Sequence, residues 1–154
     1  MMPTTTERVS SHTAEHVNEE IRRRAEELVD RVARGGRDAI DARLAELDVE
    51  WDIERTLEAN AASVSLLGIA LGALVDRRWF TLPAVVAGFL LQHAIQGWCP
   101  PISVFRRIGV RTETEINQER YALKALRGDF EGVDTARALH SAGKARQAFE
   151  AARR

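Results

Sequence analysis

Two long uncharged segments interrupt a chain that is otherwise dense in charged side chains. Asp, Glu, Lys and Arg are absent from residues 59–75 and from residues 79–105, which are 17 and 27 residues long. Only a short charged turn separates the two segments: Asp76, Arg77 and Arg78. A helix rises about 1.5 Å per residue, so about 20 residues cross a bilayer core and about 17 are the lower limit. The pattern predicts two antiparallel membrane-spanning helices, at about 57–75 and 79–98.

Tryptophans mark both ends of the second segment. Trp79 and Trp98 are 19 positions apart, so a helix places their indoles about 28 Å apart, one at each membrane interface. The first segment carries many small residues and is expected to insert weakly unless it enters the membrane together with its partner. The alternative is a buried helical hairpin inside a soluble bundle, which would need all the flanking helices of this small chain as cover.

Arginines near the segment ends predict the orientation, since cytoplasmic loops of membrane proteins are enriched in Lys and Arg. Two lie in the turn, whereas five lie on the opposite side: Arg43, Arg55, Arg106, Arg107 and Arg111. Both termini are therefore expected in the cytoplasm, with Arg106 and Arg107 anchored at lipid headgroups beyond the Pro100–Pro101 pair. The first 25 residues contain no apolar run, so no signal peptide is expected.

Small residues predict how the two helices meet. An antiparallel pair that turns near residues 76–79 brings positions to equal depth when their numbers sum to about 156. This register sets the pair Gly68 and Gly72 against Gly88 and Ala84, which allows close backbone approach. The alternative use of the Gly-x-x-x-Gly pattern is homodimerisation.

The same register gathers polar side chains in the cytoplasmic half of the hairpin. The expected cluster has five members: Asn60, Ser63, Gln92, His93 and Gln96. Amides and hydroxyls there are expected to bond across the helices. His93 is a candidate proton relay or ligand, and the alternative is a neutral histidine bonded to Ser or Gln. No second His, carboxylate or thiol lies at helical ligand spacing from His93, so no metal site and no cofactor are expected.

The rest of the chain is expected to be helical and polar. It divides into a mobile tail at 1–16, an amphipathic helical segment at 17–55, the hairpin with its interfacial segment at 56–112, and a cytoplasmic helix and tail at 113–154. The Gly35–Gly36 pair breaks the amphipathic segment. Its helices are expected to lie on the membrane, to pair as a coiled coil, or to pack on the helix after the hairpin. Thr112 and Glu115 form a capping box that opens that last helix.

Composition and charge narrow the class of protein. The 22 Lys and Arg nearly balance the 23 Asp and Glu, and a sequence pI of 6.4 gives no basic field for nucleic acid. A single cysteine excludes a disulfide framework and a multi-cysteine zinc site. An aromatic content of 6% disfavours a β-rich fold. The prediction is an all-α membrane protein, a two-helix transmembrane hairpin flanked by amphipathic cytoplasmic helices.

Two short runs after the hairpin carry a resemblance. Gly97-Trp98-Cys99-Pro100 and Ile108-Gly109-Val110-Arg111-Thr112, behind a hairpin with a small-residue first helix, resemble the YgaP-like transmembrane-domain family over roughly residues 52–112. The resemblance implies a helical hairpin of the bacterial inner membrane, found alone or attached to a rhodanese. Where a rhodanese is attached, sulfur transfer is implied. This chain lacks the Cys-x-x-Gly-x-Arg loop, and Cys99 is its only cysteine.

The expected function is non-enzymatic. The chain is interpreted as a multi-pass membrane anchor or scaffold whose partners are the lipid bilayer and either a second copy or a cytoplasmic protein. One alternative is an accessory of sulfur or redox handling through Cys99, which would need a thiolate stabilised by its surroundings. Another is a subunit of an oligomeric channel or transporter. Hydrolase and phosphate-loop motifs are absent from the sequence.

Overall fold

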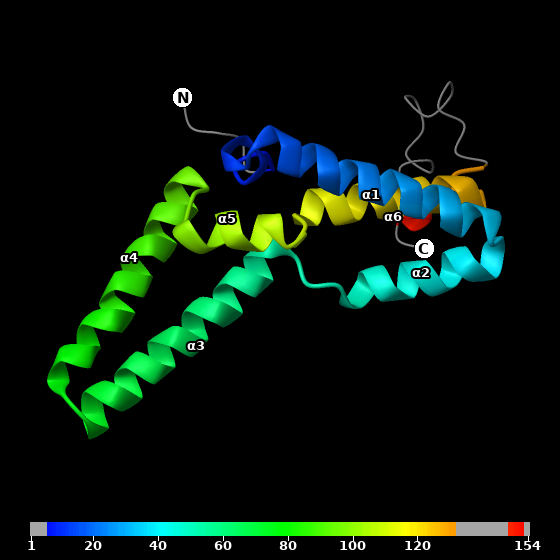
Figure 1. Cartoon of the computed structure of the whole chain (residues 1–154). Helices are drawn as coiled ribbons and strands as arrows, with labels where there is room; N and C mark the ends of the chain where they lie inside the picture. Colours follow the sequence, from blue (N-terminus) through cyan, green and yellow to red (C-terminus); the bar gives the residue numbers. More distant parts are fainter. Residues whose placement is uncertain (1–5, 132–147, 153–154) are drawn as a thin grey trace. The chain divides into compact units, whose positions relative to one another are not determined.

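The protein is described by a computed structural model that covers residues 6–131 and 148–152. Every regular element within those residues is helical, which confirms the all-α class (Figure 1). The chain forms two compact units, which are considered one at a time. The first holds residues 6–22 and 51–114, and the second holds residues 23–50, 115–131 and 148–152. Helix α1 (Glu15–Arg34) contributes its first turns to the first unit and the remainder to the second.

A helical hairpin dominates the first unit. Helix α3 (Ile53–Leu74) and helix α4 (Thr81–Gln96) run side by side in opposite directions, joined by the short 3-10 helix η2 (Arg77–Phe80) (Figure 1). Asp52 begins α3, because its carboxylate accepts a hydrogen bond from the backbone N–H of Arg55 at 2.8 Å. Asp76 caps η2 in the same way through the N–H of Arg78 at 2.8 Å. Both expected segments are therefore helical, and α3 and η2 begin with side-chain caps, whereas α4 continues from η2 without one.

A bend of 72° separates α4 from the short helix α5 (Pro100–Arg107). Gly97 ends α4 with a left-handed φ of 77°, and its N–H donates to the His93 carbonyl at 2.7 Å. Pro100 then occupies the first position of α5, where its missing N–H costs no hydrogen bond. The glycine and the proline together turn the chain back across the ends of α3 and α4 (Figure 1).

The helix register differs from the expected one. A Cβ added at Gly68 would lie 2.7 Å from Pro83 Cδ and 3.1 Å from Leu82 Cβ, five and six positions before Gly88. Gly88 and Ala84 are exposed, and an added Cβ at Gly88 meets open space. The structure therefore does not bring the two small-residue pairs together. The reason lies in η2, whose Phe80 ring packs on Gly72. Gly72 therefore lies opposite residue 80 and not opposite Ala84, so every later position of α4 is shifted relative to α3.

The core of the first unit lies at the end of the hairpin away from η2. Ile53 and Leu57 from α3 pack there with Cys99 and with Ile102 from α5, all at most 2% exposed. Val9, 3% exposed, completes this cluster from the N-terminal segment. The prediction of a mobile tail is therefore wrong for residues 6–16, which include the 3-10 helix η1 (Ser10–His12). Their sequence is polar enough to look like a tail, and only the packing of Val9 reveals their place.

The second unit is a small bundle of helix segments. Helix α2 (Arg37–Val49) and helix α6 (Glu113–Arg127) share one core with the later part of α1. That core consists of Ile40, Leu44, Leu47, Ile116 and Leu123, with Val29 and Val32 against it. Of the three expected arrangements, packing on the helix after the hairpin is the one observed. Gly36, with φ of 81°, makes the break between α1 and α2.

The C-terminal part of the chain was expected to be a helix and tail. Residues 148–152 are helical, and the Lys124 ammonium donates to the Ala152 carbonyl at 2.7 Å. Residues 113–127 form α6, and residues 132–147 and 153–154 of the predicted segment lie outside the described residues.

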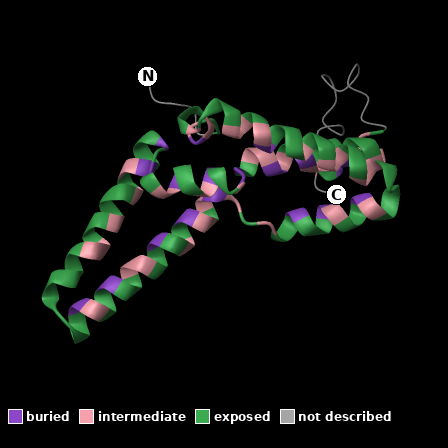
Figure 2. Cartoon of the chain, viewed as in Figure 1, coloured by how far each residue is buried: buried purple, intermediate pink, exposed green. Residues whose placement is uncertain are grey.

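Apolar side chains cover much of the hairpin surface. Figure 2 shows that exposed positions prevail along both α3 and α4, with buried positions confined to a sparse set. The helical stretch Arg37–Leu74 contains one window long and apolar enough to cross a membrane, and 22% of that window is buried. A second candidate exists only if η2, α4 and α5 count as one broken span. By length and composition, the described residues thus hold one such helix, or two with the bent pair.

Candidate functional site

Three ionisable side chains meet at the end of the hairpin away from η2. Glu54 lies in the first turn of α3 and His93 in the last turn of α4, so the antiparallel arrangement places them at the same end. His93 Nε2 lies 2.7 Å from Glu54 Oε2. Arg8 from the N-terminal segment donates from Nη2 to Glu54 Oε1 at 2.9 Å and from Nη1 to the Ala94 carbonyl at 3.4 Å. One carboxylate thus joins three separate parts of the unit.

His93 uses one of its two ring nitrogens for a hydrogen bond within the described residues. The side chain is buried, and no hydrogen-bond partner lies near Nδ1 within the described part of the chain. An ionised carboxylate only accepts hydrogen bonds, so the 2.7 Å contact is a donation from the Nε2–H of His93 to Glu54 Oε2. The Glu54 carboxylate already has Arg8 as its cationic partner. The arrangement is that of a hydrogen-bonded structural histidine.

Gly97 lets the N-terminal segment approach this cluster. A Cβ at Gly97 would lie 2.5 Å from Arg8 Cβ and 2.8 Å from the Arg8 carbonyl oxygen, and its φ of 77° disfavours other residues. Glycine is therefore needed at position 97 for two reasons: the left-handed backbone that ends α4, and the close approach of the Arg8 backbone. Position 97 connects the bend of the chain with the ionic cluster.

Arg106 lies inside the first unit, against the expectation that it anchors at lipid headgroups. Its side chain is 1% exposed, and it donates to the Val110 carbonyl at 3.0 Å and to Asn18 Oδ1 at 2.8 Å. Asn18 in turn donates to the Ser10 carbonyl at 2.9 Å. Arg106 therefore fastens the start of α1 to α5, while its neighbour Arg107 remains exposed. The sequence places both arginines after an apolar run and does not distinguish them.

Cys99 is buried among apolar side chains. It is 2% exposed, and burial raises the pKa of its thiol above the ordinary value. Cys99 is the N-cap residue of α5, a position at a helix N-terminus that can stabilise a thiolate, but its side chain makes no capping hydrogen bond. Burial is the cause of the raised pKa, and no cation is among the causes. The raised pKa is that of a packed thiol and does not favour the sulfur or redox alternative.

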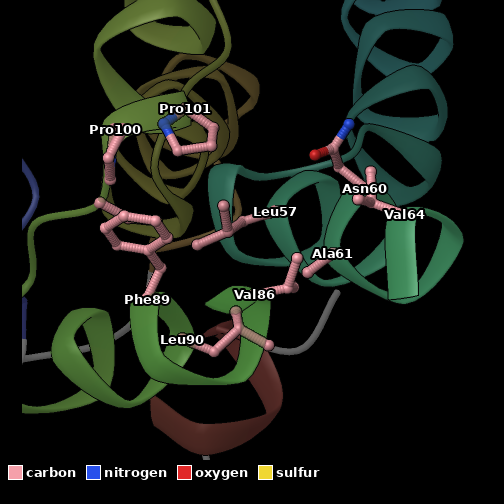
Figure 3. Close-up of a pocket in the computed structure, with 10 residues that line it drawn as sticks. Leu57, Asn60, Ala61, Val64, Val86, Phe89, Leu90, Pro100 and Pro101 are labelled. Carbon is pink, nitrogen blue, oxygen red and sulfur yellow. The ribbon is translucent and has the colours of Figure 1, made fainter. Parts of the chain in front are cut away.

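Cys99 also lines a cavity of about 250 Å³ (Figure 3). The lining comes from α3, from α4 and from the start of α5: Leu57, Asn60, Ala61, Val64, Val86, Phe89, Leu90, Cys99, Pro100 and Pro101. No charged side chain contributes to it, and almost all of its wall is carbon. In Figure 3 Phe89, Leu57 and Leu90 point toward a common space, and Asn60 lies at one edge. This apolar cavity is a candidate small-molecule site in the first unit.

The expected polar cluster is dispersed. His93 bonds across the helices, but to Glu54, which the prediction did not include. Ser63 donates to the Ala59 carbonyl of its own helix at 2.8 Å, and Asn60 lines the cavity. Gln92 is half-buried and Gln96 is exposed. The shifted register is the reason, because it brings residue 54 rather than residues 60–63 to the end of α4.

The expected interface anchors are partly exposed. Trp79 is 44% exposed in η2 and Trp98 is 36% exposed after the end of α4. Both side chains therefore present aromatic surface outward, at the two ends of the second apolar segment.

A buried ion pair organises the second unit. The Glu119 side chain is 0% exposed, and Arg43 donates to its two oxygens from Nε at 2.7 Å and from Nη2 at 3.3 Å. This forked pair raises the pKa of Arg43 further above its ordinary value. Arg43 also meets the exposed Glu46 at 2.8 Å. No sequence pattern indicates this pair, because the two residues are 76 positions apart and share no local motif.

Comparisons with known proteins add no relative. The chain matches no protein-family model, no curated protein and no solved structure. Among the described residues, no three His, Cys, Asp or Glu side chains are grouped as a metal site requires. The cavity, the apolar hairpin surface and the charges at the hairpin ends are the features of the first unit that bear on function.

Proposed function

We propose that the chain is a non-enzymatic scaffold anchored in a bacterial inner membrane by the α3–α4 hairpin. Its charged helices would bind a cytoplasmic protein or a second copy of the chain. The resemblance to the YgaP-like hairpin family points to the same compartment and stays a prediction.

The observation that carries the proposal is the exposed apolar surface of the hairpin. Large apolar side chains point outward along both helices: Leu66 67%, Leu67 56%, Leu74 85%, Val85 54%, Leu91 63% and Ile95 50% exposed. Soluble monomers rarely expose continuous apolar patches of more than a few hundred Å². A core helix of a soluble protein would be mostly buried, whereas 22% of the apolar window here is buried. A bilayer removes this surface from water without any further protein.

The distribution of charge along the hairpin supports the same placement. Arg77 and Arg78 lie at the turn, and Glu54 and Arg8 lie at the opposite end. The 22 residues of α3 span about 33 Å, close to the roughly 30 Å of a hydrocarbon core. Both charged ends would then reach the headgroup layers. The excess of arginines outside the turn supports cytoplasmic termini.

The second unit supports a scaffold role. Its ionic side chains pair with one another, as Arg127 does with Asp41 and Asp129 at 2.5 Å each. Such pairs hold helices in place. The unit thus offers a self-contained helical module with a charged outer surface, suited to a protein partner.

Arginine substitutions on the outer face of the hairpin test the proposal. Leu67→Arg and Val85→Arg replace exposed side chains, so in a water-soluble protein they should leave folding and fractionation unchanged. In a bilayer each should cost about 2.5 to 3.5 kcal/mol near the centre. We expect the unaltered chain to remain in the membrane pellet after carbonate extraction and the double variant to be largely lost from it.

The matched control is Ala45→Arg, an exposed alanine of α2 in the second unit. It should fractionate like the unaltered chain. Release of the unaltered chain by carbonate would contradict the membrane proposal, and so would equal membrane retention of the double variant and the control.

A further inference from the structure

The cavity beside Cys99 arises from the way the hairpin opens. Near the turn, α3 and α4 are in close contact, since Gly68 lies against Pro83 and Leu82. At the other end, Ile102 of α5 packs in one buried cluster with Leu57 of α3, and Leu90 of α4 packs against that cluster. Between the tight contact and this packed end, the two helices leave the 250 Å³ cavity (Figure 3). The cavity is thus framed by contacts on both sides.

The lining selects an apolar guest. Leu57, Ala61, Val86 and Leu90 present hydrocarbon, and no charged side chain reaches the wall. An apolar cavity of about 150 Å³ stays dry and binds small hydrocarbons. The volume per molecule in liquid water, about 30 Å³, serves as the unit for a small group. By that measure 250 Å³ holds roughly eight groups of methylene size. The space fits a stretch of an acyl chain.

The rim of the cavity continues the outer apolar surface. Phe89 lines the cavity and is also 39% exposed, and Leu91 on the same helix is 63% exposed. If the hairpin lies in a bilayer, this rim meets lipid chains and not water. We propose, resting on the membrane placement argued above, that the cavity binds one acyl chain of a membrane phospholipid.

A phospholipid fits better than a free fatty acid. If the chain of a fatty acid entered fully, its carboxylate would need a cationic partner. The lining contains no cationic side chain, and Asn60 is its one side-chain amide. A phospholipid leaves its headgroup at the interface and inserts only part of one chain.

Photocrosslinking of the full chain in vesicles tests this site. The vesicles consist of palmitoyl-oleoyl phosphatidylcholine with a small fraction of a phosphatidylcholine that carries a diazirine in the middle of one acyl chain. Bulk lipid should label the outward residues Leu66, Leu67 and Leu91. Lipid in the cavity should also label Leu57 and Ala61, which are 2% and 6% exposed and are reached through the cavity.

Replacement of either of two alanines by phenylalanine makes the test specific to the cavity. Ala61→Phe fills the cavity and should lower labelling of Leu57 by about tenfold, the effect of a site made about 1.4 kcal/mol weaker. Ala70→Phe adds the same side chain at an exposed position of α3 and should leave that labelling unchanged. Labelling of Leu66 and Leu67 should stay the same in both variants.

The outcomes separate the two proposals. Labelling of Leu66, Leu67 and Leu91 without Leu57 or Ala61 would leave the membrane anchor standing and overturn the lipid site. Absence of labelling at all five positions would overturn both. Labelling of Leu57 by a diazirine fatty acid and not by the phospholipid would also overturn the site as proposed. Equal labelling of Leu57 in Ala61→Phe and Ala70→Phe would do the same, whether or not Ala61→Phe perturbs folding.

Discussion

His93 and Glu54, 39 positions apart in the chain, are joined by a contact of 2.7 Å between Nε2 and Oε2. This bond ties the end of α4 to the start of α3, and Arg8 extends it to the N-terminal segment. Loss of the carboxylate should therefore loosen three parts of the first unit together. The relationship explains why a histidine inside a long uncharged segment is compatible with a purely structural role.

Glu54→Gln should lower the free energy of unfolding by about 1 to 3 kcal/mol, because it removes the partner charge of Arg8 and weakens the bond to buried His93. Glu58→Gln, on an exposed position one turn later in α3, should change it by less than about 0.5 kcal/mol. Thermal unfolding in detergent, followed by circular dichroism, measures both. Equal stability of the two variants would mean that the Arg8–Glu54–His93 cluster does not contribute.

The glycines of the hairpin should respond unequally to alanine. Gly68→Ala places a methyl group 2.7 Å from the rigid Pro83 ring and should destabilise the hairpin by about 1 to 3 kcal/mol. Gly88→Ala meets open space and should be neutral or stabilising by up to about 1 kcal/mol through helix propensity. Both can be compared by thermal unfolding. The opposite order would restore the register in which Gly68 faces Gly88.

Glu119 and Glu46 offer a comparison around one arginine. Glu119→Gln removes the fully buried, forked partner of Arg43 and should cost about 1 to 3 kcal/mol, because the charge-assisted bonds are weakened while Arg43 keeps its more exposed partners Glu46 and Glu50. Glu46→Gln removes the exposed partner of the same arginine and should cost less than about 1 kcal/mol. Denaturant titration separates the two. Similar losses would show that burial of Glu119 adds nothing to the pair.

Cys99 should react slowly with thiol reagents at neutral pH. Burial raises the pKa of its thiol, so the reactive thiolate is scarce at pH 7 and its fraction grows as the pH rises toward that higher value. The labelling rate should increase with pH beyond the point at which an ordinary thiol levels off. Maleimide labelling followed by mass spectrometry gives the rate at each pH.

A cysteine at the exposed position Ser103, introduced with Cys99→Ser, is the matched control for labelling. It should react many times faster and titrate as an ordinary thiol. Fast labelling of Cys99 in the unaltered chain would instead revive the sulfur or redox alternative.

Much of the helix content was open to prediction from local pattern. Charge-free stretches indicated α3 and α4, the glycines at 35 and 36 indicated a break, and Thr112 indicated the start of α6 at Glu113. These features depend on residues that are near one another in the chain, where propensity, capping and hydrophobic period act. Membrane insertion and the scaffold role remain predictions of the same kind.

Contacts between residues far apart in the chain were not predicted from the sequence. The turn through η2 changed the register, so Gly88 lost its expected partner and His93 met Glu54. Val9 and Arg106 carry no local mark of burial, and both became buried because the N-terminal segment packs on α5.

The sequence by itself thus determined where helices form and where charge is absent, because both are set within a few turns of chain. The tertiary structure decided which helix faces meet, that Cys99 and Arg106 are buried, and where α3 and α4 separate to leave a cavity. Those outcomes depend on the geometry of one turn and one bend, and a displacement of a few residues there changes every contact between the two helices.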